Sequence, residues 1–458
     1  MELSIVILAA GLGKRMRSDL PKVLHTLAGK PLLEHVVRAT QKLVSAEPII
    51  VYGHQGEKVK HVLAHLNVRW VEQKEQRGTG HAVQQALPFI PKENHVLILC
   101  ADVPLISADT LKKLIAATPS DAIGIIAAHL KDPKGLGRIQ RDSQNNIVNI
   151  IEEKDATEKE RAINEINSGI YLIPSAFLHR WLPELKNNNA QEEFYLTDII
   201  RLAVAETIAI HSIEAPHNEE ILGINDRAQL AQLERFYQRK TADKLMQQGV
   251  TLADPNRLDV RGDLTVLSDT FIDINVITEG HVTIGSHCSI GPNTVLRNVV
   301  IGNHVEIKAN CVIDGAEIAN HCIIGPFARL RPGAVLAEKT HVGNFVEIKN
   351  SVIGSATKIN HLSYIGDSEI GRDVNIGAGT ITCNYDGINK HKTIIGHEAF
   401  IGSNTALVAP ITVGEGATIG AGSTLTRNAP AHQLTLTRAD QRSVLNWQRP
   451  KKKEKTEK

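Results

Sequence analysis

A run of glycines and basic residues follows the first apolar segment of the chain and is suited to bind phosphate. Residues 8–16 read Leu-Ala-Ala-Gly-Leu-Gly-Lys-Arg-Met. A glycine-rich turn after a strand brings backbone N–H groups close to phosphate oxygens. Met16 stands where the dinucleotide-binding fingerprint needs glycine, and Arg15 stands where a P-loop needs serine or threonine. Together with Lys14, Arg15 and Lys22, the turn predicts a cationic cradle for a polyphosphate.

Polar residues further along the first half have the chemistry of a nucleotide–sugar site. Asp102 follows an apolar run typical of a strand, and ligands of open α/β sheets bind at the carboxyl ends of the strands. A carboxylate that faces phosphates there is a natural Mg²⁺ ligand. Gln73 and the Gly-Thr-Gly run at 78–80 can contact a base and a sugar. Glu152 and the Asn-Ser-Gly run at 167–169 can bind sugar hydroxyls.

The elements that must position these residues alternate between short apolar runs and amphipathic segments. The runs at 5–8, 48–52 and 96–100 are continuously apolar, as in strands covered on both faces of a parallel sheet. Segments 32–43 and 108–117 have the pattern of intervening helices. Because strands alternate with helices, the first part of the chain is expected to form a doubly wound, Rossmann-like α/β domain.

One long helical pattern separates this part from the rest of the chain. Between residues 226 and 248, apolar residues recur near helical spacing. Asp226 with Gln229 three residues later resembles a capping box, and Gly249 is a suitable stop. We expect residues 226–249 to form a linker helix between two domains.

From about residue 250 onward, an aliphatic residue followed by glycine recurs at short intervals. One aliphatic series steps by six residues throughout: Ile395, Ile401, Leu407, Val413, Ile419 and Leu425. This period is the signature of a parallel β-helix, in which each repeat supplies one short strand and a turn. A β-sandwich would instead alternate with period two. Residues 382–393 break the period and carry amides, a ring and two lysines, so we expect a loop that serves a polar ligand.

Composition excludes several classes of protein. Lys and Arg total 51 against 50 Asp and Glu, and aromatic residues make up 4% of 458 residues, so no nucleic-acid partner is expected. The five cysteines form no Cys-Xaa-Xaa-Cys pair, which argues against zinc and suits a reducing compartment. No apolar run is long enough for a bilayer span or a signal segment, so a cytoplasmic protein without membrane insertion is expected. The lysine-rich end at 451–455 is interpreted as a solvated tail.

Longer strings of the sequence resemble a known family. Residues 8–16 with Pro21-Lys22 resemble the signature of sugar-1-phosphate nucleotidylyltransferases. With the strings at 331–333, 343–349, 375–380 and 384–387, nearly the whole chain resembles the bacterial bifunctional N-acetylglucosamine-1-phosphate uridylyltransferase / glucosamine-1-phosphate N-acetyltransferase family. The resemblance implies a left-handed β-helix and a homotrimer with acetyltransferase sites between subunits. We expect four parts: a uridylyltransferase domain at 1–225, the linker helix at 226–249, the β-helix at 250–437 and a tail at 438–458.

For the first domain, the resemblance implies that UTP and N-acetylglucosamine-1-phosphate give UDP-N-acetylglucosamine and pyrophosphate. Arg15 and Lys22 would stabilise the phosphates, and Asp102 with Asn225 would hold Mg²⁺. Lys14 departs from the threonine that the family more often has, and Cys100-Ala101 replaces the common Tyr-Gly before the metal site. The UDP-N-acetylglucosamine contacts that the family implies are Leu8, Ala9, Ala10, Gly11, Lys22, Gln73, Gly78, Thr79, Cys100, Ala101, Asp102, Gly137, Glu152, Asn167 and Asn225.

For the β-helix, the resemblance implies acetyl transfer from acetyl-CoA to glucosamine-1-phosphate. His361 would be the general base, because histidine titrates near neutral pH, and Glu347 would orient the imidazole or pair with it. Cys383 is interpreted as a bystander, with direct transfer preferred over an acyl-cysteine. The implied glucosamine-1-phosphate contacts are Arg331, Lys349, Tyr364, Asn375 and Lys390. The implied acetyl-CoA contacts are Ala378, Asn384, Tyr385, Ser403, Ala421 and Arg438.

Two other functions stay open at this point. One is a nucleotidylyltransferase whose β-helix only regulates or oligomerises, as in the adenylyltransferases of storage-glucan synthesis. It would need neither a base such as His361 nor the Asn384-Tyr385 loop. The other is a non-catalytic scaffold, which would not need Asp102 together with Lys22. The residues favour the two-activity enzyme, which would supply precursors of peptidoglycan and lipopolysaccharide.

Overall fold

The computed structural model describes residues 2–43, 47–53 and 55–450, and the lysines at 451–455 lie outside these ranges. The described residues form two compact units. The first extends to Asp243 and includes Val260–Gly262, and the second contains Lys244–Asp259 and the residues from Asp263 onward. None of the described helices is long and apolar enough to cross a membrane.

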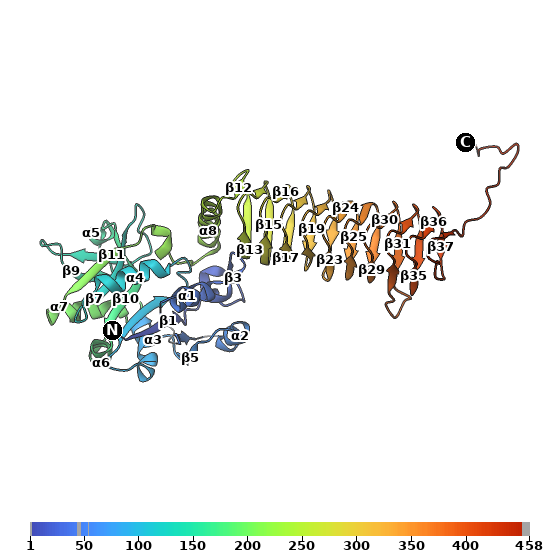
Figure 1. Cartoon of the computed structure of the whole chain (residues 1–458). Coiled ribbons are helices and arrows are strands. Elements are labelled where there is room, and N and C mark those ends of the chain that lie inside the picture. The colour runs from blue at the N-terminus through green and yellow to red at the C-terminus, as the bar shows by residue number, and fades with distance from the viewer. Residues whose placement is uncertain (1, 44–46, 54, 451–458) are drawn as a thin grey trace, which may run out of the picture. The chain divides into compact units, whose positions relative to one another are not determined.

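A mainly parallel sheet forms the centre of the first unit (Figure 1). Its order is β11-β7-β10-β6-β1-β4-β5, and β10 runs antiparallel to both of its neighbours. The apolar runs expected as strands lie in β1, β4 and β6, so the doubly wound α/β prediction is confirmed. The strands are β1 (Leu3–Ala9), β4 (Ile49–Tyr52), β5 (Arg69–Glu72), β6 (His95–Cys100), β7 (Ile123–His129), β10 (Glu165–Pro174) and β11 (Ile210–Glu214), with a hairpin β8 (Arg138–Arg141) and β9 (Ile147–Ile151) beside β10 and a small ladder β2 (Thr26–Leu27) and β3 (Lys30–Pro31).

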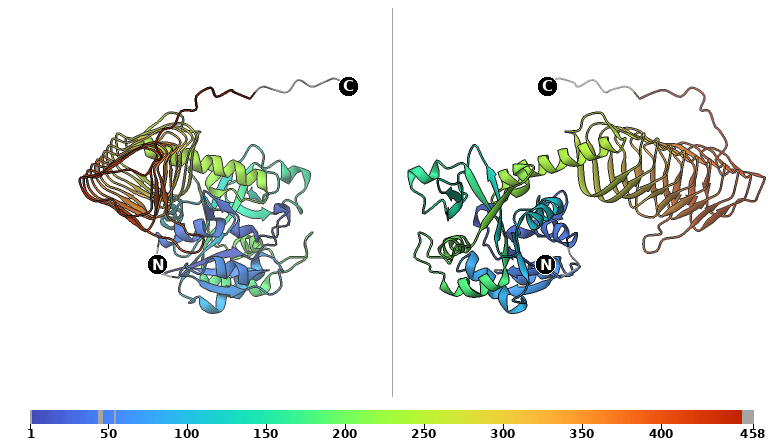
Figure 2. Two further views of the ribbon diagram at one scale, coloured as in Figure 1. Left: turned by 90° about the vertical axis from the view of Figure 1, so that its right-hand side faces the viewer. Right: turned by 60° about the vertical axis from the view of Figure 1, so that its left-hand side comes forward.

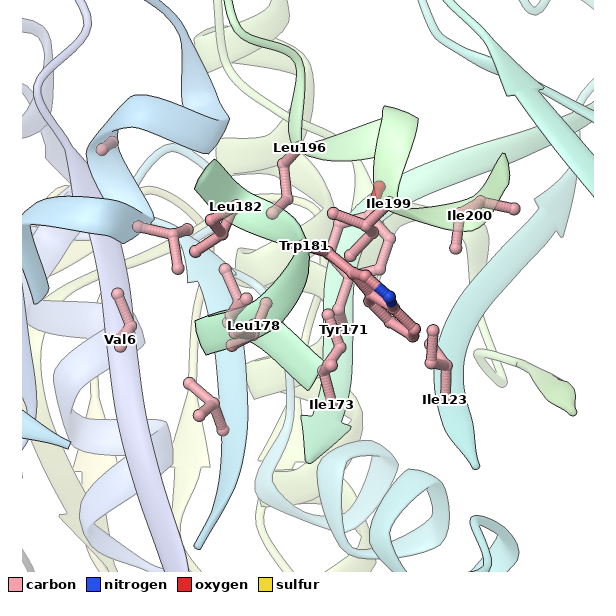
Figure 3. Packing of buried hydrophobic residues seen from close by; sticks show 14 of the residues in the cluster. Val6, Ile123, Tyr171, Ile173, Leu178, Trp181, Leu182, Leu196, Ile199 and Ile200 are labelled. Carbon is pink, nitrogen blue, oxygen red and sulfur yellow. The ribbon is translucent and has the colours of Figure 1, made fainter. Parts of the chain in front are cut away.

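Helices cover both faces of this sheet because its side chains are apolar on both sides. Along β1, Val6 packs into the core on one face, and Ile5 and Ile7 pack into the core on the other. Figure 3 shows the first of these cores, where Trp181 and Ile199 pack beside the sheet. The helices are α1 (Leu32–Gln41), α2 (Gly56–Val62), α3 (Thr79–Ala86), α4 (Ala108–Ala117), α5 (Glu158–Arg161), α6 (Ser175–Trp181) and α7 (Ile199–Ala205).

The expected linker helix is α8 (Arg227–Gln247). Asp226 Oδ1 accepts the backbone N–H of Gln229 at 2.9 Å, as a helix cap does. The side-chain oxygen of Gln229 accepts the backbone N–H of Asn225 at 2.7 Å. In a capping box this bond would come from the N–H of Asp226, one residue later. The start of this helix therefore also fixes the backbone at Asn225.

The second unit is a parallel β-helix with a triangular cross-section (Figure 2). The six-residue series from Ile395 to Leu425 lies inside the prism, with every member buried. Between β31 (Ile381–Cys383) and β32 (Thr393–Ile395), the loop expected from the broken period is exposed at Tyr385 and Lys390.

The strands of the β-helix are short, and each pairs with the equivalent strand of the next coil. One sheet contains β12 (Thr251–Leu252), β14 (Phe271–Ile272), β16 (Ser289–Ile290), β18 (Glu306–Ile307), β21 (Ile323–Ile324), β24 (His341–Asn344), β27 (Lys358–His361), β30 (Asn375–Ile376), β33 (Phe400–Ile401), β36 (Thr418–Ile419) and β38 (Leu434–Thr435). The other contains β13 (Leu258–Val266), β15 (Val276–Ile284), β17 (Val295–Ile301), β19 (Val312–Asp314), β20 (Glu317–Ile318), β22 (Arg329–Leu330), β23 (Ala334–Leu336), β25 (Glu347–Lys349), β26 (Ser351–Ile353), β28 (Tyr364–Gly366), β29 (Ser368–Ile370), β31 (Ile381–Cys383), β32 (Thr393–Ile395), β34 (Ala406–Val408), β35 (Ile411–Val413) and β37 (Thr424–Leu425).

The inward aliphatic positions are expected to carry the stability of the β-helix. Ile313 is 0% exposed, whereas Ile388 in the loop is 86% exposed. Ile313→Ala should lower the free energy of unfolding by about 2–5 kcal/mol, because it leaves a cavity in the prism. The matched change Ile388→Ala should alter it by less than about 0.5 kcal/mol. Urea denaturation followed by circular dichroism measures both, and equal midpoints for the two variants would contradict the inward assignment.

Candidate functional site

A cavity of about 590 Å³ lies at the carboxyl ends of β1 and β6, and we call it the β1–β6 pocket. Because these strands pair in parallel, Leu8 and Cys100 lie side by side at its wall. The predicted residues that line the pocket are Leu8, Ala9, Ala10, Gly11, Lys14, Arg15, Lys22, Gln73, Gly78, Thr79, Cys100, Ala101 and Asp102. Other residues of the wall were not predicted from the sequence, namely Leu12, Val23, Gln76, Ala82, Gln191 and Glu193.

The ammonium of Lys22, which lines this pocket, joins two predicted oxygen ligands, of which Asp102 lines the pocket and Asn225 does not. Lys22 Nζ donates to a carboxylate oxygen of Asp102 and, at 2.8 Å, to the amide oxygen of Asn225. The side chains of Lys22 and Asp102 are 11% and 26% exposed, so water screens this contact only weakly. The fold therefore brings these three predicted residues together, although Lys22 and Asn225 are 203 positions apart.

Local backbone geometry explains how Lys22 reaches this position. Gly13 has φ +60°, in the left-handed region, and a Cβ there would lie 2.6 Å from the Cβ of Lys22. On the opposite side, the N–H of Ile224 donates to the carbonyl of Asp102 at 2.8 Å. That bond brings Asn225 close to Asp102 in the chain fold.

Gly137, Glu152 and Asn167 form a second predicted group. The N–H of Asn167 donates to the carbonyl of Gly137 at 2.9 Å, and a Cβ at Gly137 would lie 3.6 Å from Glu152 Oε2. Burial raises the pKa of Glu152, and negative charges such as Asp155 act in the same direction. The hydroxyl of Thr197 donates to Glu152 at 3.1 Å and opposes the shift. Thr197 was not predicted from the sequence, since it belongs to no motif.

Internal hydrogen bonds hold Gln73 and Thr79 at the pocket wall. Gln73 Nε2 donates to the carbonyl of Gly78 at 3.1 Å and contacts His81 Nδ1 at 2.9 Å. Thr79 Oγ1 accepts the N–H of Leu196 at 2.9 Å. Because the contacts of Gln73 use Nε2, its amide oxygen is the group that can accept a hydrogen bond from a ligand.

In the β-helix, His361 belongs to a column of residues that repeat on successive coils. For each member after the first, the next residue in the chain donates its backbone N–H to the carbonyl of the member one coil earlier, at 2.7–3.3 Å. At the end of the column, the Arg438 guanidinium donates to the carbonyl of Ala421 at 3.1 Å. Predicted acetyl-CoA contacts thus follow His361 in register. The members of this His361 column are Asn344, His361, Ala378, Ser403 and Ala421.

The side chain of Asn344 contacts the imidazole directly. Asn344 Oδ1 lies 2.8 Å from His361 Nδ1, and the strands β24 and β27 pair these two residues in register. An amide oxygen can only accept, so Nδ1 carries the hydrogen in this contact. Asn344 is not among the predicted site residues. Its spacing of 17 residues from His361, one coil of the helix, is the signal that could have found it.

Glu347 pairs with an arginine in the described structure, and its expected role toward His361 stays a prediction. Arg331 donates to Glu347 Oε1 at 2.8 Å. The register of the coils pairs Glu347 with Arg329 and Tyr364 in the sheet of β22, β25 and β28. His361 ends β27 in the other sheet, where its in-register partner is Asn344.

Two predicted lysines, Lys349 and Lys390, form a lysine pair near Asp367. Contact with the ammonium of Lys349 lowers the pKa of Lys390. Burial would raise the pKa of Asp367, but hydrogen bonds from the Asn350 and Asn384 amides and the charges of both lysines lower it. The cluster therefore holds more positive than negative charge, and an anionic ligand would relieve the repulsion.

The remaining predicted residues of the β-helix lie on both of its sheets. Tyr364 neighbours Glu347 in register, and Asn375 pairs with Lys358 on the sheet that carries His361. Tyr385 is exposed in the loop, where its hydroxyl donates to the carbonyl of Gly387. The predicted residues of the β-helix are thus divided between its two sheets and the loop after β31.

Comparisons with known proteins agree with this division of the chain. Residues 5–250 match the family of MobA-like NTP transferase domains, and residues 392–427 match the hexapeptide repeat of succinyl-transferase. The bifunctional protein GlmU of Acinetobacter baumannii (strain AYE) is 53% identical over 455 residues, covering 99% of this chain and 100% of that protein. The bifunctional protein GlmU of Legionella pneumophila (strain Lens) is 54% identical over 460 residues, with the same coverage.

The environment of Cys100 makes a prediction about its reactivity. Burial raises the pKa of its thiol to about 12, and the charges of Asp102 and Glu152 add to this effect. At pH 8 only about one molecule in 10⁴ would then carry the reactive thiolate. Iodoacetamide at pH 8 should modify Cys100 at least about 100-fold more slowly in the folded chain than in urea, as measured by mass spectrometry. Similar rates in both states would contradict the raised pKa of the thiol.

Proposed function

The chain belongs to the family of bifunctional GlmU proteins, and from this premise we propose which of its residues carry the two reactions. It is a bifunctional transferase of UDP-N-acetylglucosamine synthesis. Its fold is a doubly wound nucleotidyltransferase domain followed by a left-handed β-helix of hexapeptide repeats. The observation that carries the proposal is the convergence of Lys22, Asp102 and Asn225 in one unit and of Asn344 and His361 in the other.

Uridylyl transfer is assigned to the β1–β6 pocket. A phosphate oxygen of N-acetylglucosamine-1-phosphate attacks the α-phosphorus of UTP, and pyrophosphate leaves with the electron pair of the broken P–O bond. Arg15 and Lys22 line the pocket and neutralise phosphate charge. The amide oxygen of Gln73 is placed to accept a hydrogen bond from the uracil N–H group.

The pair of oxygens on Asp102 and Asn225 fits Mg²⁺. Both are hard oxygen donors, and they already converge on one cation, the Lys22 ammonium. We assign these two residues as the ligands that the chain supplies. When bound, the metal neutralises charge on the phosphate oxygens.

Glu152 is assigned to the sugar. Its carboxyl group lies beside Gly137, where the absence of a side chain leaves room, and burial favours its protonated form at a higher pH than usual. A carboxyl of this kind can bind sugar hydroxyls together with the amide of Asn167.

Acetyl transfer is assigned to the part of the β-helix that carries the His361 column and the lysine pair. Asn344 holds the Nδ1–H of His361, so Nε2 is the nitrogen that accepts a proton from the amine of glucosamine-1-phosphate. The amine nitrogen then bonds to the thioester carbonyl carbon, and CoA leaves as its thiolate. Lys349 and Lys390 bind the sugar phosphate, which relieves their mutual repulsion. The later members of the column line the acetyl-CoA groove.

Glu347 takes a supporting role in this assignment, since it fixes the guanidinium of Arg331 toward the same phosphate. Direct transfer needs no acyl-cysteine, and Cys383 stays a predicted bystander. The homotrimer, the cytoplasmic location and the domain limits at 225, 249 and 437 also stay predictions. Membership of a bifunctional family decides against a β-helix that only regulates or assembles.

The role of Glu152 gives a test that separates the two substrates of the pocket. Glu152→Ala should raise the KM for N-acetylglucosamine-1-phosphate about tenfold and change the KM for UTP less than about threefold, because only the sugar loses a hydrogen-bond partner. Steady-state pyrophosphate release measures both constants. Glu158→Ala removes an exposed glutamate from α5 and serves as the control. Equal increases in both KM values would contradict the assignment.

The role of Asn344 gives a test of the acetyltransferase site. Asn344→Ala should lower kcat for CoA release on the order of 10²-fold with little change in KM, because His361 loses its fixed tautomer. Asn344→Asp keeps an acceptor oxygen at the same atom and should retain most of the activity. An Asn344→Ala enzyme with normal kcat, or an Asn344→Asp enzyme as inactive as Asn344→Ala, would refute the positioning role.

A further inference from the structure

The contact of Lys22 with Asp102 and Asn225 occupies the same oxygen atoms that are assigned to the metal. Lys22 Nζ touches the Asp102 carboxylate and lies 2.8 Å from Asn225 Oδ1. A lysine ammonium has three hydrogens, and two of them are used here. The ammonium therefore satisfies both oxygens.

Removal of this ammonium would leave an unfavourable group in the pocket. Asp102 is only 26% exposed, and its carboxylate would face the partial negative charge of the Asn225 amide oxygen. A carboxylate in a largely buried site is costly unless a cation or hydrogen-bond donors compensate it. The backbone bond from Ile224 to Asp102 keeps Asp102 and Asn225 adjacent. Without the ammonium, the oxygen pair would therefore favour another cation.

We propose that Lys22 is the resident cation of the Asp102–Asn225 pair, and that a divalent metal ion must displace it to bind. This inference rests on the proposed function, which assigns the metal to these oxygens. The free enzyme then binds metal weakly, since the ammonium competes for the same atoms. A polyphosphate offers Lys22 other oxygens, so nucleotide and metal each favour the binding of the other.

The proposal differs from a general effect of positive charge in the pocket. Arg15 lines the same pocket and carries the same charge, but within the described ranges no contact joins it to Asp102. Loss of Arg15 would change the electrostatic potential at the Asp102 and Asn225 oxygens but would leave the Lys22 ammonium in contact with them. Arg15→Met is therefore the matched control for Lys22→Met.

Binding of Mn²⁺ to the full-length, nucleotide-free chain tests the proposal, with electron paramagnetic resonance to count free metal. Lys22→Met should bind Mn²⁺ about tenfold more tightly than the unaltered chain, and Arg15→Met should change the affinity less than about threefold. Mn²⁺ should also raise the melting temperature of Lys22→Met more than that of the unaltered chain. In the double variant Lys22→Met/Asp102→Asn, which leaves no unpaired carboxylate, the gain in affinity should disappear.

Equal or weaker binding by Lys22→Met, or an equal gain in Arg15→Met, would overturn the proposal. If Lys22→Met does not fold without metal, Lys22→Gln provides a neutral side chain that can still donate to Asp102, and it should show the same direction of change. Mn²⁺ binding in the presence of UTP separates this inference from its premise. Binding with UTP but no gain in Lys22→Met refutes the competition alone, whereas no binding under any condition refutes the metal assignment as well.

Discussion

Parallel strand pairing is the constraint on which both sites depend. Neighbouring parallel strands end at the same edge of a sheet, so residues that follow them meet however far apart they lie in the chain. In the first unit this pairing sets the end of β1 beside the end of β6, and Lys22 reaches Asp102 from there. In the β-helix the same pairing recurs once per coil and aligns Asn344 with His361. The two units differ in architecture, but in both of them parallel strand pairing positions the site residues.

The distribution of charge explains why the two sites suit phosphorylated ligands. At the β1–β6 pocket, the Lys22 ammonium contacts the oxygens of Asp102 and Asn225. A metal ion can take its place on these oxygens while a polyphosphate binds the ammonium. In the β-helix, the Lys349 ammonium lowers the pKa of Lys390, and the acidic neighbour Asp367 compensates only part of the positive charge. In the proposed function, a phosphate group would pair with the excess positive charge of that cluster.

The sequence predicts the fold well because periodicity depends on local patterns. The patterns that predict the elements are visible within short segments of the sequence. Examples are the apolar runs at 5–8, 48–52 and 96–100 and the six-residue series from Ile395 onward. The side-chain partners within the sites are harder to predict, since they depend on register. Glu347 has an imidazole 14 positions away in the sequence but an arginine beside it in the prism, and Thr197 reaches Glu152 from a segment without a motif. The residues of the pocket follow from motifs and family resemblance, whereas the contact of Lys22 with both oxygen ligands requires the structure.

The central claim is that one chain carries two independent active sites. The most direct measurement follows CoA thiol release and pyrophosphate release separately in purified His361→Ala and Asp102→Ala variants of the full-length chain. The account predicts that His361→Ala loses thiol release and keeps pyrophosphate release, and that Asp102→Ala shows the reverse. Loss of both activities in either folded variant, or an unaltered chain that never releases CoA, would contradict it.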